Sequence, residues 1–326
     1  MKHKIMMVLW SMAFMGHGPI LDEVSAAPPS NKNPGYEFVT AWGSKGSAPG
    51  KFNKVTGIAV AGKEVFVSDA RNSRIQVFGL EGNFKRQFSV PGDNTSKLSR
   101  PMNLTIQGGE VYVADYLNDR IEVFALDGAL LRTIGRSGNG PGEFNSPGGV
   151  AVASNGDLVV SDFYNQRIQK LRADGTFIRQ WGETGQRGIR AGKFNYPTDV
   201  ALNETGMMFV ADGYNDRIQV FSPDGRFAYK WGGPLTVNIS GSKPGWFKTV
   251  TGLTLDKNGN VFAADFYHHR IQKFSADGAF LTAFGEKGTG PGKFKLPMAV
   301  AVAGDGSVFV TDFGNNRIQK WRPQFE

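Results

Sequence analysis

A short motif that occurs six times is the feature that most constrains how this chain can fold. A run of apolar and small residues ends in Asp, and an Arg followed directly by Ile comes five residues later. The six pairs are Asp69 and Arg74, Asp115 and Arg120, Asp162 and Arg167, Asp212 and Arg217, Asp265 and Arg270, and Asp312 and Arg317. Successive Asp residues lie 46, 47, 50, 53 and 47 positions apart. A period of this length indicates an array of structural repeats.

Each repeat has the sequence pattern of four short strands. An apolar run such as Gly57–Val60 opens the repeat, and the run that ends in Asp, the run that begins with Arg-Ile and an aromatic run such as 177–181 follow. Turns such as Asn155-Gly156 and Asp174-Gly175 separate them, and such dipeptides are strong hairpin signals. No segment sustains a helical period. We therefore predict an all-β fold, a six-bladed β-propeller with four antiparallel strands per blade.

The two ends of the array predict how the ring closes. The last repeat stops after three strands, at Trp321-Arg322, whereas an orphan strand at 38–43 precedes the first complete repeat. That orphan closely matches the fourth strand at 280–285. We predict that the N-terminal strand completes the last blade, because a closed ring leaves no exposed sheet edges.

These motifs resemble the NHL repeat. In the clearest copy, a Gly-x-Phe-x-x-Pro segment at 192–197 leads to the Asp-x-x-Asn-x-Arg-Ile-Gln-x-Phe segment at 212–221. The resemblance covers 36–322 and implies a propeller, but not one function. NHL propellers include RNA-binding modules, sensor domains, protein scaffolds and amidating lyases, so function has to be argued from the site.

The N-terminus predicts export. Two lysines, Lys2 and Lys4, precede an apolar run at 5–15, and small residues at 24–27 follow, as in a signal peptide. We expect cleavage after Ala26, a disordered linker at 27–35 and the propeller at 36–326. Eleven apolar residues are too few to span a bilayer, and no later segment is apolar enough. The predicted location is periplasmic or extracellular.

The six Asp–Arg pairs are interpreted as structural, because a propeller needs one active site and not six. We expect each carboxylate to accept backbone N–H groups in the turn after the second strand and to pair with its Arg. The Asn residues of these turns are expected to adopt left-handed backbone angles. They are Asn72, Asn118, Asn165, Asn215 and Asn315.

Function is expected where the repeats differ, in the two positions after each repeated Asp. We predict that these loops share one face with the linkers between blades, where aromatic residues can bind a peptide, a sugar or a flat ligand. The alternative is that the rings pack the seams between blades. The predicted binding residues in these loops are Arg71, Tyr116, Phe163, Tyr164, Tyr214, Phe266, Tyr267 and Phe313.

Charge also gathers on the linkers. They carry 14 Lys or Arg against five acids, a net +9, whereas the whole chain has a net charge of +8. Arg187, Arg190 and Lys193 are the predicted centre of this basic face, although a merely solvated face is the alternative. In the linker at 232–246, Trp246 and Leu235 are predicted either to contact a partner or to fold back. The expected partner is another protein or an anionic glycan, bound by a monomer or by a subunit of an envelope complex, and no nucleic acid is expected.

Neither a catalytic set nor a cofactor is predicted. The chain has no Cys, and His268 and His269 are adjacent, so they do not supply a zinc site. Amidating lyases of the family use His ligands from several blades, which this sequence lacks. Asn103 and Asp199 are candidates either for a calcium site, as in lactonase propellers, or for capping their strands. We therefore predict a non-catalytic scaffold or recognition module, with a metal-dependent lyase or lactonase and an RNA-binding NHL module as alternatives.

Overall fold

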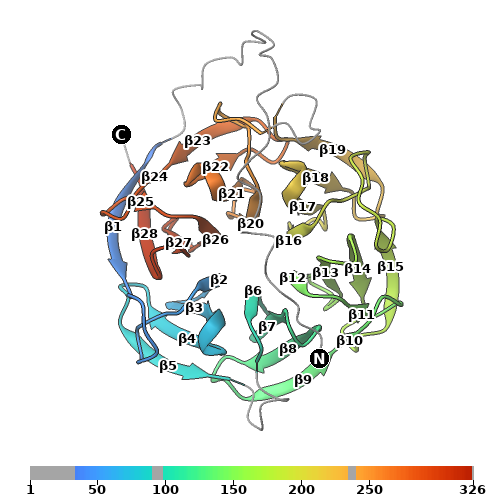
Figure 1. Cartoon of the computed structure of the whole chain (residues 1–326), viewed down its shortest axis with the longest axis horizontal. Coiled ribbons are helices and arrows are strands. Elements are labelled where there is room, and N and C mark those ends of the chain that lie inside the picture. The colour runs from blue at the N-terminus through green and yellow to red at the C-terminus, as the bar shows by residue number, and fades with distance from the viewer. Residues whose placement is uncertain (1–33, 90–97, 234–239, 325–326) are drawn as a thin grey trace, which may run out of the picture.

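The computed structural model describes residues 34–89, 98–233 and 240–324, which form a closed ring of six blades (Figure 1). Each blade is a four-stranded antiparallel sheet, with its first strand beside the central channel and its fourth at the rim. This confirms the predicted six-bladed β-propeller. The predicted signal peptide at 1–26, and the predicted linker as far as residue 33, lie outside the described residues.

The blades follow one another along the chain. The first three consist of β2 (Val55–Ala61), β3 (Glu64–Asp69), β4 (Arg74–Gly79) and β5 (Phe84–Phe88), of β6 (Pro101–Gln107), β7 (Glu110–Asp115), β8 (Arg120–Ala125) and β9 (Leu130–Ile134), and of β12 (Pro147–Val152), β13 (Leu158–Asp162), β14 (Arg167–Leu171) and β15 (Phe177–Trp181). The last three consist of β16 (Pro197–Leu202), β17 (Met208–Asp212), β18 (Arg217–Phe221) and β19 (Phe227–Trp231), of β20 (Val250–Leu255), β21 (Val261–Asp265), β22 (Arg270–Phe274) and β23 (Phe280–Phe284), and of β26 (Pro297–Val302), β27 (Val308–Asp312), β28 (Arg317–Pro323) and β1 (Tyr36–Trp42).

Short elements lie in the connections. Two linkers contain small parallel pairs, and three loops between second and third strands form single 3-10 turns. The pairs are β10 (Arg136–Ser137) with β11 (Glu143–Phe144) and β24 (Glu286–Lys287) with β25 (Lys293–Phe294), and the turns are η1 (Ala70–Asn72), η2 (Gly213–Asn215) and η4 (Phe266–His268).

The repeated motif sets the register of every blade. Each repeated Asp ends the second strand and pairs directly with the repeated Arg that opens the third. Side chains opposite one another in an antiparallel pair lie close together. The register therefore brings the six carboxylates and the six guanidinium groups together at the same end of the strands.

The ring closes through the N-terminal strand, as predicted. β1 pairs antiparallel with β28, with Tyr36 opposite Pro323 and Trp42 opposite Ile318. The indole of Trp42 also lies 6.0 Å from the ring of Phe78 in the first blade and 6.1 Å from that of Phe309 in the last. This strand therefore both completes the last sheet and packs the seam beside it.

The core lies between neighbouring blades, where side chains of adjacent sheets interdigitate. The Phe of each Gly-x-Phe linker fills such a seam. Phe52, Phe144, Phe194, Phe247 and Phe294 are all 0% exposed, and Leu98 takes this place before the second blade at 1%. The linkers are thus anchored to the core by one apolar side chain each.

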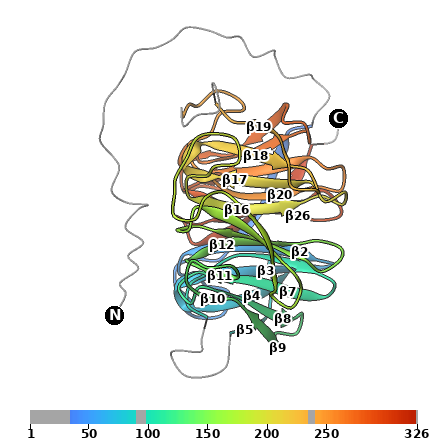
Figure 2. The ribbon, with the colours of Figure 1, turned by 90° about the vertical axis from the view of Figure 1, so that its right-hand side faces the viewer.

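Seen from the side, the blades form a disc whose loops project on two opposite faces (Figure 2). One face, here called the linker face, combines the linkers between blades with the loops between second and third strands. The two kinds of loop bond to each other: the backbone N–H of Ala70 donates to Lys54 O, that of Tyr116 to Arg100 O and that of Tyr214 to Asn195 O. No helix in the described part of the chain is both long and apolar enough to span a membrane.

Removing β1 tests the closure. A variant that keeps the export segment but lacks residues 27–43 leaves the last blade with three strands and an open edge. We expect insolubility or a fall in Tm of about 10 °C or more, since several kcal/mol of packing is lost. Thermal unfolding by circular dichroism measures it. Deletion of residues 27–33 alone removes no part of β1 and is the control; equal melting of both variants contradicts the closure.

Candidate binding site on the linker face

Each repeated Asp is the centre of a buried hydrogen-bond network. Asp212 Oδ1 accepts the backbone N–H of Asn195 at 2.7 Å, and its Oδ2 accepts from Asn215 Nδ2 at 2.8 Å, Arg217 Nε at 2.7 Å and Gln219 Nε2 at 3.0 Å. Both Asp212 and Arg217 are 0% exposed. The same four kinds of donor surround the Asp of the first, third and last blades, and His268 replaces the Asn in the fifth.

The partner Arg extends this network into the linker. Arg217 Nη2 donates to the carbonyl oxygens of Arg190 and Lys193, and Gln219 Nε2 donates to the latter as well. A buried charge is tolerated where hydrogen bonds and an opposite charge compensate for lost hydration. This geometry supports the interpretation of the Asp–Arg pairs as structural.

Two details of the sequence-based expectation are wrong. The backbone N–H on each carboxylate comes from the linker before the blade, as with Asn195 on Asp212, and not from the turn after the second strand. The left-handed residue is also not the Asn, because its amide must stay beside the carboxylate. The next residue reverses the chain instead, with φ from 53° to 59° at Ser73, Asp119, Gln166, Asp216, His269 and Asn316.

These left-handed residues also join neighbouring blades. A second row of left-handed residues precedes each first strand, at Lys54, Arg100, Ser146, Tyr196, Thr249 and Leu296, with φ from 52° to 64°. Their backbone N–H groups donate to the side chains of the first row: Ser146 to Asp119 at 2.7 Å, Thr249 to Asp216 at 2.6 Å, Tyr196 to Gln166 at 2.6 Å, Leu296 to His269 Nδ1 at 3.0 Å and Lys54 to Asn316 at 2.8 Å.

Both histidines singled out in the sequence therefore have hydrogen-bond partners within the frame. His269 Nδ1 accepts from a backbone N–H, which requires the neutral ring, and burial lowers its pKa. His268 Nδ1 lies 3.0 Å from Asp265 Oδ2. In the described ranges, no three His, Cys, Asp or Glu side chains come together as a metal-binding group.

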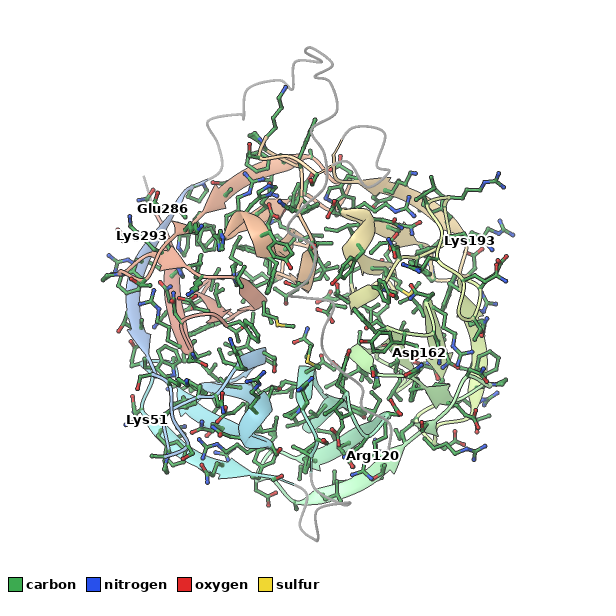
Figure 3. All side chains as sticks on the ribbon, viewed as in Figure 1. Lys51, Arg120, Asp162, Lys193, Glu286 and Lys293 are labelled. Carbon is green, nitrogen blue, oxygen red and sulfur yellow. The ribbon has the colours of Figure 1, made fainter. Side chains whose placement is uncertain are left out.

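The second blade departs from the common network. Glu122 takes the place of the Gln in the other blades, and Arg120 Nε (Figure 3) lies 2.6 Å from Glu122 Oε1 but 3.7 Å from Asp115 Oδ2. Asp115 still accepts from Ser99 N at 2.7 Å and from Asn118 at 2.6 Å. Burial raises the pKa of Asp115 to about 6 and also raises the pKa of Glu122.

A pocket opens on the linker face at the mouth of the central channel. Four predicted binding residues form its aromatic wall: Tyr116, Phe163, Tyr164 and Tyr214. The ring of Phe163 lies 6.2 Å from that of Tyr116, 5.1 Å from Tyr164 and 6.5 Å from Tyr214. The remaining lining comes mainly from the starts of the inner strands, with Thr56, Met102, Thr198, Thr251 and Met298 among it. We call this cavity the aromatic pocket.

The other predicted aromatic residues lie elsewhere. Phe266 is 1% exposed and packs against the rings of Tyr267 at 4.9 Å and Phe313 at 6.1 Å. Phe266 and Tyr267 do not line the aromatic pocket, and Phe313 lines a smaller cavity beside it. The predicted ring of aromatic side chains is therefore one-sided, because only rings of the second to fourth blades line the aromatic pocket.

The smaller cavity is here called the side pocket. It lies between the sixth, first and second blades and is lined by Lys54, Arg71 and Arg100, together with Phe313 and residues of the strand starts. The side pocket and the aromatic pocket share Thr56, Met102 and Met298, so the two cavities adjoin.

The predicted centre of the basic face lines neither pocket. Lys193, labelled in Figure 3, is on the outer side of the ring and forms an ion pair with Glu183. Arg187 and Arg190 are exposed, and the guanidinium of Arg187 lies 5.5 Å from the ring of Tyr196. Within other linkers Arg136 pairs with Glu143 and Lys293 with Glu286. The linker charge is therefore divided into outer, partly paired cations and an inner group at the side pocket.

Trp246, which was predicted either to contact a partner or to fold back, lies against its own linker. Trp246 is half-buried, and the ammonium of Lys243 lies 5.8 Å from its ring. A Cβ on Gly241 would meet its indole at 2.0 Å, so the ring packs against its own linker. Leu235 lies outside the described residues.

Asp199 and Asn103 meet at the strand starts beside the channel. Asn103 Nδ2 donates to Asp199 Oδ2 at 2.5 Å, and the backbone N–H of Leu253 donates to the same oxygen at 2.9 Å. Asp199 is 1% exposed, and burial raises its pKa to about 7. Gly149 leaves the room for it, since a Cβ there would lie 2.0 Å from Oδ1. Because an amide donor faces this carboxylate, the pair lacks the converging oxygens that Ca²⁺ takes.

Lys54 and Arg100 were counted among the linker charges but were not predicted as binding residues. Tyr196, whose ring centroid lies 4.9 Å from that of Phe163, and the Met and Thr side chains at the strand starts were not predicted either. The available signal was positional: Lys54, Arg100 and Tyr196 each directly precede a first strand. Alignment of the repeats on that residue places all three at the same point of their blades.

Asp212→Ala tests the structural role of the networks. We expect the free energy of unfolding to fall by about 3–5 kcal/mol, because the buried guanidinium of Arg217 loses its counter-charge. Chemical denaturation measures it. Asp224→Ala, which removes an exposed carboxylate on the opposite face, is the control and should leave the free energy of unfolding nearly unchanged. Wild-type stability of Asp212→Ala with loss of ligand binding would instead make Asp212 a site residue.

Asp199→Asn tests the buried carboxyl. Because the pKa of Asp199 is raised in the folded state, that state binds the proton more tightly than the unfolded chain does. The stability of wild type relative to the variant should therefore fall as pH rises from about 4 to 7, by at most about 1.4 kcal/mol per pH unit. Denaturation at pH 4, 5, 6, 7 and 8 follows it. A difference that stays constant across this range contradicts the raised pKa.

The comparisons with known proteins bear on the fold. The family model described as "NHL repeat" matches residues 52–78, 144–171, 247–274 and 294–321, which lie in the first, third, fifth and last blades. No curated protein gives a significant sequence match.

Solved structures match over most of the chain. A structural genomics protein of unknown function from Bacteroides thetaiotaomicron has a TM-score of 0.68 at 17% identity, over 89% of this chain and 76% of that one. A streptogramin B lyase has a TM-score of 0.59 at 16% identity, over 90% and 98%. A catalytically inactive virginiamycin B lyase from Staphylococcus aureus with quinupristin has 0.55 at 20%, over 84% and 85%. At these identities the similarity shows a common fold only.

Proposed function

We propose that this chain, an NHL-repeat β-propeller, is an exported binding module without catalytic activity that receives its ligand or partner on the linker face. The observation that carries the proposal is the aromatic pocket, whose wall of buried and half-buried rings lies beside a group of cations. A concave, mainly apolar pocket with a few polar groups is the usual form of a ligand site.

Charge supports the choice of partner. An excess of Lys and Arg on the linkers favours a protein with an acidic surface or an anionic glycan. Export through the N-terminal segment removes the chain from nucleic acid, so the RNA-binding alternative of the family is not preferred. The site belongs to one propeller and needs no second copy, which fits a monomer or one subunit of an envelope complex.

An enzyme of the lyase or lactonase kind is the second candidate. Asp199 favours it, because a buried carboxyl with a pKa of about 7 near a pocket has the properties of a general base. Against it, both hydrogen bonds to Asp199 Oδ2, from Asn103 and from the backbone N–H of Leu253, hold the carboxyl in the frame of the strands. A ligand recovered unchanged after incubation supports binding alone, whereas conversion that Asp199→Asn abolishes supports the enzyme.

The aromatic pocket is tested with a neutral fluorescent probe, N-phenyl-1-naphthylamine, whose rings can stack on its wall. We expect Tyr214→Ala to weaken probe binding about tenfold through lost stacking and apolar contact. Fluorescence titration measures the dissociation constant.

The matched control is Tyr229→Ala, which removes a Tyr from the outer strand β19 that bonds to Ala276 O. We expect it to leave probe binding unchanged. No saturable binding to the wild type, or equal losses in the two variants, contradicts the proposed site.

A further inference from the structure

We propose that the side pocket binds an acidic group, so that the ligand of the aromatic pocket is a small amphipathic anion, distinct from a partner held by the outer linkers. Such a molecule has an aromatic or otherwise apolar body and one carboxylate, sulfate or phosphate. The inference rests on the proposed function, since the body occupies the aromatic pocket while the acidic group enters the side pocket.

The two cavities are joined in a way that suits one ligand. Met102, Met298 and Thr56 line both of them, so the aromatic rings and the cations lie on either side of the same three side chains. The aromatic pocket is the larger of the two cavities and offers its rings to the body of a ligand, whereas the side pocket has room for about one oxygen atom of an acidic group. A ligand with both parts fills both cavities at once.

The cations of the side pocket have no acidic partner within residues 34–89, 98–233 and 240–324. No ion pair there includes Lys54, Arg71 or Arg100. Arg100 Nη1 is also buried without a hydrogen-bond partner among these residues. A buried donor without an acceptor is costly, and an incoming anion supplies the acceptor.

These cations are held close together despite their repulsion. Burial and then the charge of Arg71 lower the pKa of Lys54, with Lys295 and Lys45 adding to the effect. Burial also lowers the pKa of Arg100, and Arg71 adds to this effect as well. A bound anion relieves this repulsion, because opposite charges in a partly desolvated site attract more strongly than in water.

The frame of the blades fixes where the cations stand. Lys54 and Arg100 are left-handed residues directly before β2 and β6. The backbone N–H of Lys54 donates to Asn316, and its ammonium lies 4.4 Å from the ring centroid of Phe313, which is 6% exposed. Preorganised charges lose little conformational freedom on binding, which favours affinity.

Two dyes with nearly the same rings test the inference. 8-Anilino-1-naphthalenesulfonate carries one sulfonate, and N-phenyl-1-naphthylamine has no charge. We expect the wild type to bind the sulfonate at least about tenfold more tightly, as for a charge-assisted hydrogen bond. Only the affinity for the sulfonate should fall as NaCl is raised, because salt screens the charge.

Charge-removing variants locate the effect. Arg100→Gln and Arg71→Gln should each weaken binding of the sulfonate about tenfold and leave binding of the neutral dye unchanged. Arg71 is exposed, so its variant tests the inference even where loss of Arg100 lowers stability. Arg172→Gln, an exposed cation on the turn after β14, is the matched control and should alter neither affinity.

The outcomes separate the two proposals. Equal affinity of the wild type for both dyes, or equal losses in Arg71→Gln and Arg172→Gln, overturns the acidic-group site and leaves the aromatic pocket intact. Failure of both dyes to bind overturns the proposed function itself. We expect that saturating heparin does not displace the sulfonate dye from the wild type. Displacement that occurs in the wild type and is lost in Arg71→Gln would mean that the side pocket binds a polymeric anion and not a small one.

Discussion

One fully buried carboxylate in each blade is the interaction on which the linker face depends. Asp162, labelled in Figure 3, accepts from the linker backbone, from the loop that follows its own strand and from the third strand, through Asn145 N, Asn165 and Arg167. Such a charge is stable in the interior only while these donors surround it. Each network therefore fixes three segments at once. Between blades, hydrogen bonds from one row of left-handed residues to the other connect neighbouring blades.

The binding site follows from this frame. Because linkers and loops are held by repeated bonds, the residues between these bonds can differ without loss of the fold. Phe163 occupies the first loop position after the repeated Asp, where Ala70 and Gly213 stand in other repeats. Tyr214 occupies the second position, where Arg71 and Gly314 stand, and the aromatic pocket forms where the large residues meet. The repeated residues thus give the site rigidity, and the variable ones give it chemistry.

Much of the fold could be predicted because its signals are local and periodic. The Asp–Arg spacing set the strand register, and the match between the orphan strand and the fourth strands identified β1 as the partner of β28. The loop geometry was predicted less well. Which residue takes the left-handed angle depends on the Asn amide staying on Asp212, and the backbone donor to that carboxylate lies in a linker 17 residues earlier.

The sequence by itself determined the number of blades, their strands and the sharing of one face by linkers and loops, because each depends on a pattern inside one repeat. Only the tertiary structure decided which side chains meet. Net charge on the linkers could not show that Lys193 pairs with Glu183 at the rim while Lys54 and Arg100 line a pocket with no carboxylate paired to them in the described residues. Asn103 and Asp199, 96 residues apart, likewise meet only because ring closure brings the strand starts of different blades together around one channel.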